Sequence, residues 1–181
     1  MVQQAAAVDP VSEVADLLPF LRRYARAVTG NQDTGDRFAL ATLETLIAEP
    51  RLLIEASSPR IALYRSFDAV WRSAGAPLGQ PDTPLSRRAQ AHMGELTPNS
   101  REALLLFAIE EVTPDEIGEI MGLEVPEVIG LIEAAKREML QSIAGSVLVI
   151  EDEAIIAMDL SSIVRDLGHR VTGVARTHRQ A

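Results

Sequence analysis

The chain has 181 residues, of which 47% are apolar, which is enough for one or two small domains with hydrophobic cores. Its formal net charge of −9 repels nucleic acid and anionic lipid, and the absence of cysteine excludes disulfides and thiolate zinc sites. No apolar run approaches the roughly 18 residues of a membrane span, and residues 1–10 are too polar for a signal peptide, so we expect a cytoplasmic protein without a membrane partner.

The first part of the chain is expected to form a helical bundle over residues 11–75, after a tail at 1–10. Apolar residues recur there at the spacing of one helix face. Gly30 is a stop signal, and Ser58 with Pro59 is a start signal, a capping hydroxyl followed by proline at the first helical position. One helix or two are predicted over residues 11–30, and one helix each over 34–48 and 59–73.

Residues 76–95 are predicted to form a linker, because three prolines interrupt any continuous element. A short helix fits at 86–93. Thr97 and Pro98 then repeat the start signal of a capping hydroxyl followed by proline. This predicts a helix over 98–111.

The segment 113–141 has the pattern of a helix-turn-helix, and it completes a second predicted bundle over 96–142. Its first helix has a start signal in Thr113, followed by proline at the first helical position and by glutamate three residues after the cap. Gly122 supplies the left-handed residue that ends this helix. A second apolar-striped helix follows. Such units usually read DNA with their second helix.

At Gly145 the apolar pattern changes from that of helices to that of strands. Residues 147–150 are all apolar, as in a strand buried on both faces, and residues 170–175 have the pattern of a second strand. A predicted helix at 154–167 joins them, which makes one crossover and therefore a parallel pair. Since two strands cannot close a core, residues 146–181 are expected to be the first part of a larger α/β domain.

Three segments of this sequence resemble known families. The first helix of region 2 of extracytoplasmic-function sigma factors is similar to residues 17–30, LLPFLRRYARAVTG. Region 4 of the same factors is similar to residues 97–123, TPNSREALLLFAIEEVTPDEIGEIMGL. The opening of a two-component receiver domain is similar to residues 147–175, VLVIEDEAIIAMDLSSIVRDLGHRVTGVA. In this order the segments resemble the PhyR-type general stress response regulators, and the resemblance covers most of residues 11–175.

The resemblance implies a mainly α fold, with a bundle like sigma region 2, a helix-turn-helix bundle like region 4 and an incomplete flavodoxin-like βαβ receiver. It implies an anti-anti-sigma response regulator and not an enzyme. The sigma-like part is expected to mimic an extracytoplasmic-function sigma factor and to sequester its anti-sigma factor, a basic helical protein of the NepR type. In the intact protein, a histidine kinase is expected to phosphorylate the receiver and thereby free the sigma-like surface.

The second helix of the helix-turn-helix lacks the residues with which such sigma factors bind DNA. They carry lysine, serine and arginine near its middle, where this chain has Ile129, Gly130 and Leu131. Residues 96–141 include three basic and ten acidic residues. Contacts between basic residues and phosphates supply most of the non-specific affinity for DNA, and this acidic segment would instead repel the phosphates. We therefore expect no DNA partner. The alternative is a DNA-binding sigma factor with an attached receiver, in which these replacements are ordinary drift.

Apolar residues on the expected helix faces are candidate contacts for the anti-sigma partner, since partner helices dock apolar anchors inside a polar rim. In the second helix of region 2, sigma factors carry a glutamine and a glutamate that bind the polymerase. This chain has Leu40 and Ala41 at those two positions. The alternative for each candidate is an ordinary place in the core. The acidic excess indicates a basic partner segment. The candidates are Leu17, Leu21, Phe38, Leu40, Leu43, Ile129, Ile132 and Glu133.

An acidic triplet follows the first predicted strand. Ligands gather at the carboxyl ends of parallel strands, and Mg²⁺ binds one or two carboxylates together with water and phosphate oxygens. The resemblance implies that Glu151 and Asp152 help to hold Mg²⁺ in an intact receiver, and the alternative is a solvated charge run. The phosphate-accepting aspartate of receivers follows a third strand, so we expect no phosphoacceptor and no bound Mg²⁺ in this chain. The three histidines are scattered, and no catalytic residue is predicted.

Overall fold

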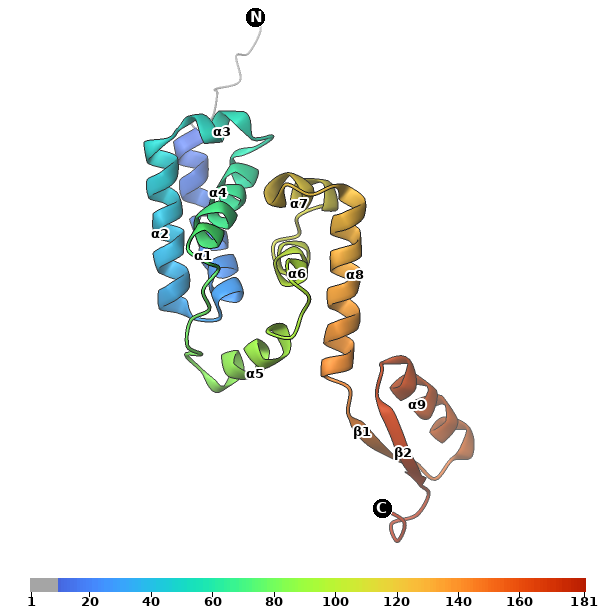
Figure 1. Ribbon diagram of the computed structural model, residues 1–181. Helices are drawn as coiled ribbons and strands as arrows, with labels where there is room; N and C mark the ends of the chain where they lie inside the picture. The colour runs from blue at the N-terminus through green and yellow to red at the C-terminus, as the bar shows by residue number, and fades with distance from the viewer. Residues whose placement is uncertain (1–9) are drawn as a thin grey trace, which may run out of the picture. The chain divides into compact units, whose positions relative to one another are not determined.

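The computed structural model describes residues 10–181, with side chains from residue 14 onward, and divides into two compact units (Figure 1). The described part of the first unit, Met1–Ala135, is helical, and the second unit, Lys136–Ala181, carries a two-stranded sheet. The predicted tail at 1–10 lies outside the described residues, except for Pro10, which begins the first helix. No helix in the described part combines the length and the hydropathy that crossing a bilayer requires.

The first bundle has one helix in each of the three predicted segments and one short helix that the sequence pattern did not predict. Ser58 caps α4 and Pro59 is its first residue, as predicted. The second helix begins two residues earlier than predicted, because the Asn31 side chain accepts a hydrogen bond from the Thr34 N–H at 2.8 Å. The missed helix, α3, has five residues, too few for an apolar period to show. The helices are α1 (Pro10–Thr29), α2 (Gln32–Ala48), α3 (Arg51–Glu55) and α4 (Pro59–Ser73).

The linker contains a helix, α5 (Pro84–Met93), which begins at a capping box between Thr83 and Ser86. The next helix, α6 (Ser100–Ala108), begins two residues later and ends three residues earlier than the predicted 98–111. Asn99 has a left-handed backbone with φ 68°, a conformation that asparagine tolerates better than most residues, and it places Thr97 and Pro98 in a turn before the helix. A capping residue followed by proline is therefore an ambiguous signal.

The helix-turn-helix forms as predicted, from α7 (Pro114–Met121) and α8 (Val125–Ser142). Thr113 and Glu116 make a reciprocal capping box at the start of α7. Gly122 ends it with φ 69°, and its N–H donates to the Gly118 carbonyl. Both signals act within four residues along the chain, which is why the sequence alone reveals them.

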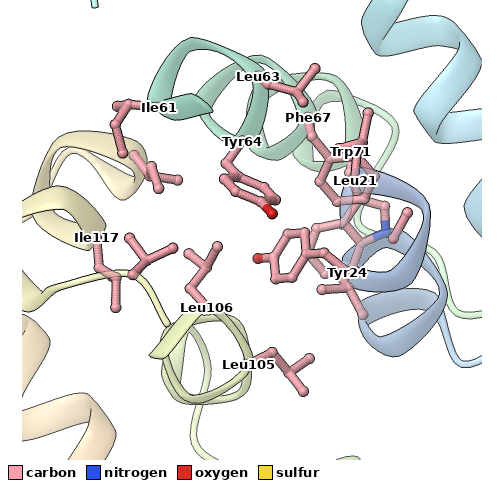
Figure 2. Packing of buried hydrophobic residues seen from close by; sticks show 14 of the residues in the cluster. Leu21, Tyr24, Ile61, Leu63, Tyr64, Phe67, Trp71, Leu105, Leu106 and Ile117 are labelled. Atoms are coloured by element: carbon pink, nitrogen blue, oxygen red, sulfur yellow. The ribbon is translucent and has the colours of Figure 1, made fainter. Parts of the chain in front are cut away.

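The two predicted bundles share one hydrophobic core. Tyr24 of α1 packs edge-on against Tyr64 and Phe67 of α4, with ring centroids 5.3 and 5.4 Å apart. Figure 2 shows Leu106 of α6 and Ile117 of α7 on the other side of the same cluster. Helix α6 contacts α1, and α7 contacts α4. The region 4-like part is therefore packed directly on the region 2-like part.

The C-terminal unit is the predicted crossover, with strands β1 (Ser146–Ile150) and β2 (Arg170–Ala175) in parallel and helix α9 (Ala154–Asp166) between them. The expectation that β1 is buried on both faces is wrong. Val149 is buried, whereas Leu148 and Ile150 are exposed. Successive side chains of a strand point to opposite faces, and α9 contacts both strands of this sheet.

We predict opposite effects for two glycine substitutions. Neither glycine has an atom within 4 Å of where a Cβ would lie, so the outcome depends on backbone conformation alone. Gly122→Ala forces alanine into the left-handed region and is expected to lower the free energy of unfolding by about 1 kcal/mol. Gly130→Ala, inside α8, is expected to raise it by roughly 0.5–1 kcal/mol. Urea unfolding of both variants measures this, and equal effects would contradict it.

Candidate functional site

A cavity of about 550 Å³ lies between α1, α5 and α6, in the helical unit. Met93, Leu105 and Ile109 give it apolar walls. Three arginines of α1 also line it, Arg22, Arg23 and Arg26, and each is about half exposed. Three neighbouring arginines repel one another unless carboxylates neutralise their charge.

Each of these arginines is paired with a carboxylate of another element. The Arg22 guanidinium donates to both Asp36 oxygens on α2, at 2.8 and 2.7 Å, and these bonds hold the pKa of Asp36 below its usual value. Arg26 lies 3.3 Å from Asp82 in the linker. Arg23 pairs with Glu110 at 2.9 Å. The arginines therefore connect elements of the unit, and they do not form an open phosphate-binding patch.

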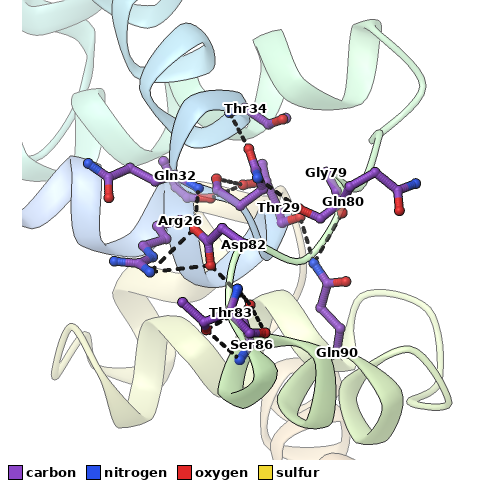
Figure 3. A network of polar contacts seen from close by, with 12 residues as sticks. Arg26, Thr29, Gln32, Thr34, Gly79, Gln80, Asp82, Thr83, Ser86 and Gln90 are labelled. Carbon is purple, nitrogen blue, oxygen red and sulfur yellow. Dashed lines mark hydrogen bonds and ion pairs between the residues drawn. The ribbon is translucent and has the colours of Figure 1, made fainter.

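The linker is held on the corner between α1 and α2 by a network of polar contacts (Figure 3). Asp82 accepts hydrogen bonds from the Gln32 N–H at 3.1 Å and from the Ser86 hydroxyl at 3.0 Å. The Gln90 amide donates to the carbonyls of Thr29 and Gly79, at 3.3 and 3.2 Å. The predicted linker is thus an ordered strap whose position is fixed by directional bonds.

A second, smaller cavity of about 350 Å³ lies where α1 meets the loop between α6 and α7. Leu17, a predicted contact, lines it together with Phe20, which the sequence analysis did not single out. Phe20 is exposed, and the Arg23 guanidinium carbon lies 5.2 Å from its ring centroid. An exposed aromatic ring beside a cavity is a typical anchor for a partner side chain.

The other predicted contacts fall into exposed, half-buried and buried groups. Leu40 is 58% exposed on α2 and Ile129 is 43% exposed on α8, and Glu133 is also exposed. Leu17, Phe38 and Leu43 are half-buried and pack against the core. The prediction is wrong for Leu21 and Ile132, which are 0% and 4% exposed and belong to the core. Helical spacing identifies an apolar stripe, but the neighbouring helices decide which of its members stay accessible.

Helices α2 and α3 carry further exposed apolar residues that the sequence analysis did not select. Ile47 of α2 and Ile54 of α3 are among the most exposed large hydrophobic residues. Leu40 and Ile47 are seven positions apart, so they lie on one face of α2. That spacing is the signal that could have found this patch.

Helix α8 presents acidic and apolar residues where a DNA-reading helix presents basic ones. Glu127, Ile129, Gly130 and Glu133 are exposed, whereas Val128 is buried against the core. Carboxylates on this surface would repel DNA phosphates. The geometry of a helix-turn-helix is kept, and its surface suits a protein partner with basic residues.

The acidic corner of the C-terminal unit holds the two carboxylates predicted to bind metal. One Glu151 oxygen accepts a hydrogen bond from the Glu153 N–H at 3.0 Å, and the Arg176 guanidinium donates to the Asp152 carbonyl at 3.0 Å. No group of three or more acidic or histidine side chains with the geometry of a metal site occurs in the described residues. Two adjacent carboxylates are the kind of oxygen ligands that Mg²⁺ binds together with water.

Two family models match the helical unit. The sigma2 domain of PhyR matches residues 14–68, and the sigma-like domain of the response regulator PhyR matches residues 93–142. The phyllosphere-induced regulator PhyR of Methylorubrum extorquens is 40% identical over 168 residues, 93% of this chain and 63% of that protein. The chain thus spans somewhat less than two thirds of this curated relative.

Solved structures agree with these matches. The anti-anti-sigma factor PhyR of Bartonella quintana, complexed with the anti-sigma factor NepR, is 37% identical with a TM-score of 0.79, over 95% of this chain and 66% of that chain. The PhyRSL–NepR complex of Sphingomonas sp. Fr1 is also 37% identical, with a TM-score of 0.64, over 73% of this chain and 87% of that chain.

We predict that Asp82→Asn loosens the strap. The hydrogen bond from the Gln32 N–H lowers the pKa of Asp82, so the bond stabilises the docked strap at neutral pH and is lost only in acid, as the pH falls through a pKa that lies below the usual value of aspartate. The variant is expected to show faster amide hydrogen exchange over residues 77–90 at pH 7, whereas the parent loosens only in acid. Glu95→Gln, the same charge change at an exposed residue, is the control. Unchanged exchange in Asp82→Asn would contradict the assigned role.

Proposed function

Because the chain belongs to the PhyR family of response regulators, we propose that its helical unit binds an anti-sigma factor of the NepR kind and so frees the sigma factor which that protein holds. The observation that carries the proposal is the surface of α8, which has the place of a DNA-reading helix and the charge of a protein-binding one. The related PhyR proteins of Bartonella quintana and Sphingomonas were solved in complex with NepR.

Binding of this kind needs apolar anchors and a rim of complementary charge. Leu40 on α2 and Ile129 on α8 supply exposed anchors on the two sigma-like parts, and Phe20 and Leu17 line a cavity between them. The acidic residues of α8 attract a basic partner and speed its association. The shared core already holds the two parts together, so a partner that contacts both does not lose binding free energy in ordering them.

The C-terminal unit is proposed to belong to the receiver that controls this binding, in a cytoplasmic regulator without enzymatic activity of its own. In a complete receiver, Glu151 and Asp152 would hold Mg²⁺, which neutralises phosphate oxygens during phosphoryl transfer. Here one carboxylate is occupied by the Glu153 N–H, which orients it at the end of β1. A histidine kinase is the proposed phosphate source for the intact receiver.

We predict that a purified NepR-type anti-sigma protein binds this chain at micromolar concentration or tighter, measured by isothermal titration calorimetry. Leu40→Ala and Ile129→Ala are each expected to weaken binding by about 5- to 30-fold, the range for a buried apolar anchor. Leu85→Ala, at an exposed leucine of α5, is the matched control and should bind like the parent. No detectable heat and no co-elution in gel filtration would refute the proposed function.

The alternative of a DNA-binding sigma factor makes the opposite prediction. It requires promoter binding that strengthens steeply as salt is lowered, because each phosphate contact releases counterions. The acidic surface of α8 instead predicts no shift of promoter DNA in a gel-shift titration at low salt. A salt-dependent complex that is lost on changing exposed α8 residues would favour the alternative.

A further inference from the structure

Glu110 is a fully buried carboxylate in the loop between α6 and α7, and its side chain is 0% exposed. Three side chains of the region 2-like bundle contact it. The Arg23 guanidinium of α1 donates to both carboxylate oxygens at 2.9 Å. The Tyr64 hydroxyl of α4 donates to the carboxylate at 2.7 Å, and Arg60 of α4 donates to the Glu110 backbone carbonyl. We call this set the Glu110 clasp.

The clasp joins segments that are far apart in the sequence. Arg23 and Glu110 are separated by 87 residues, and Tyr64 and Glu110 by 46. Arg23 also donates to the Ile109 carbonyl at 3.1 Å, so it holds the loop backbone as well as the carboxylate. The loop leads directly into α7. The clasp therefore ties the start of the helix-turn-helix to α1 and α4.

The arrangement keeps the two side chains that donate to the carboxylate, those of Tyr64 and Arg23, protonated. Burial, with the Glu110 carboxylate beside it, raises the pKa of Tyr64 above its usual value, so the hydroxyl stays protonated and donates. The Glu110 hydrogen bond likewise raises the pKa of Arg23. Arg23 and Tyr64 converge on the Glu110 carboxylate, while Arg60 donates to the backbone carbonyl of the same residue, so a small rotation of the loop would break several bonds at once.

The Arg23–Glu110 pair is a modest source of net stability, because removing the Glu110 carboxylate from water offsets much of its attraction to Arg23, whose side chain stays about half exposed. The apolar core around Tyr24, Leu106 and Ile117 already provides non-directional attraction between the two parts. A bidentate arginine–carboxylate pair adds what apolar packing lacks, a fixed geometry. The clasp therefore acts on orientation more than on stability.

We propose that Glu110 is a positioning residue that fixes the angle between the region 2-like and region 4-like parts, so that one anti-sigma partner can contact Leu40 on α2 and Ile129 on α8 together. This inference rests on the proposed function for its second half only. Without the clasp, the partner must order the two parts as it binds, and that loss of preorganisation weakens its affinity.

The orientation is tested by measuring a distance across the two parts in the full chain. The sequence has no cysteine, so Glu44→Cys on α2 and Asp115→Cys on α7, both exposed, accept spin labels at two defined places. Pulsed electron spin resonance is expected to give one narrow distance distribution in the parent and a clearly broader one with Glu110→Gln. Glu95→Gln, an exposed carboxylate with the same charge change, should leave the distribution narrow. An unchanged distribution in Glu110→Gln would overturn the inference.

The binding arm uses a purified NepR-type anti-sigma protein and calorimetry. Glu110→Gln is expected to raise the Kd about tenfold or more, and Glu95→Gln to leave it unchanged. A broader distribution with an unchanged Kd would overturn the link between orientation and binding. If the parent itself fails to bind, the proposed function fails, whereas the distance measurement still decides whether Glu110 sets the angle.

A folding control separates orientation from simple unfolding. Circular dichroism at the measurement temperature reports helix content for every variant. If Glu110→Gln has lost helix, Tyr64→Phe takes its place, because phenylalanine keeps the ring contact with Tyr24 and removes only the hydroxyl donor. Tyr64→Phe is then expected to broaden the distribution and raise the Kd, and a parent-like result in both measurements would overturn the inference.

Discussion

Tyr24 packs edge-on against both Tyr64 and Phe67, and around this aromatic cluster α1, α4, α6 and α7 bury their apolar faces together (Figure 2). The other features of the helical unit depend on this shared core. It brings the loop that carries Glu110 against α1 and α4, where a carboxylate can be buried only because Arg23 and Tyr64 satisfy it. Apolar burial supplies the attraction, and the buried polar contacts select one arrangement.

The proposed function follows from a contrast between shape and charge. A helix-turn-helix keeps its geometry through local caps and a few buried residues such as Ile117 and Val128. Its outward surface is free to change, and in this chain it carries carboxylates and an exposed isoleucine. The three arginines of α1 do not restore a nucleic-acid surface, because each is paired with a carboxylate. A helix-turn-helix, which usually binds DNA, therefore has a surface here that would bind a basic protein.

The C-terminal unit shows how strongly strand burial depends on the rest of a sheet. Its strands pair in parallel and α9 contacts both of them, yet alternate residues of β1 stay exposed. The chain spans 63% of its relative from Methylorubrum extorquens. The role of Glu151 and Asp152 in holding Mg²⁺ is a proposal for a complete receiver.

The sequence by itself determined the features that are decided within a few residues along the chain. The ends of α7 are set by Thr113, Glu116 and Gly122, and the start of α4 is set by Ser58. The change of apolar period at Gly145 indicates the strand–helix–strand crossover. These signals are local hydrogen bonds and backbone preferences, so no distant partner is needed to read them.

Only the tertiary structure decided which residues of an apolar stripe are covered and which charges are buried. Leu21 and Ile132 looked like surface anchors, but neighbouring helices cover them, whereas Leu40 and Ile129 stay exposed. Glu110 is, with Glu102, one of two buried residues among the ten acidic ones between 96 and 141, and nothing local distinguishes it from its exposed neighbour Glu111. Its burial depends on hydrogen-bond donors 46 and 87 residues away. Apolar periodicity and capping signals report only on neighbours along the chain, so they do not predict these contacts.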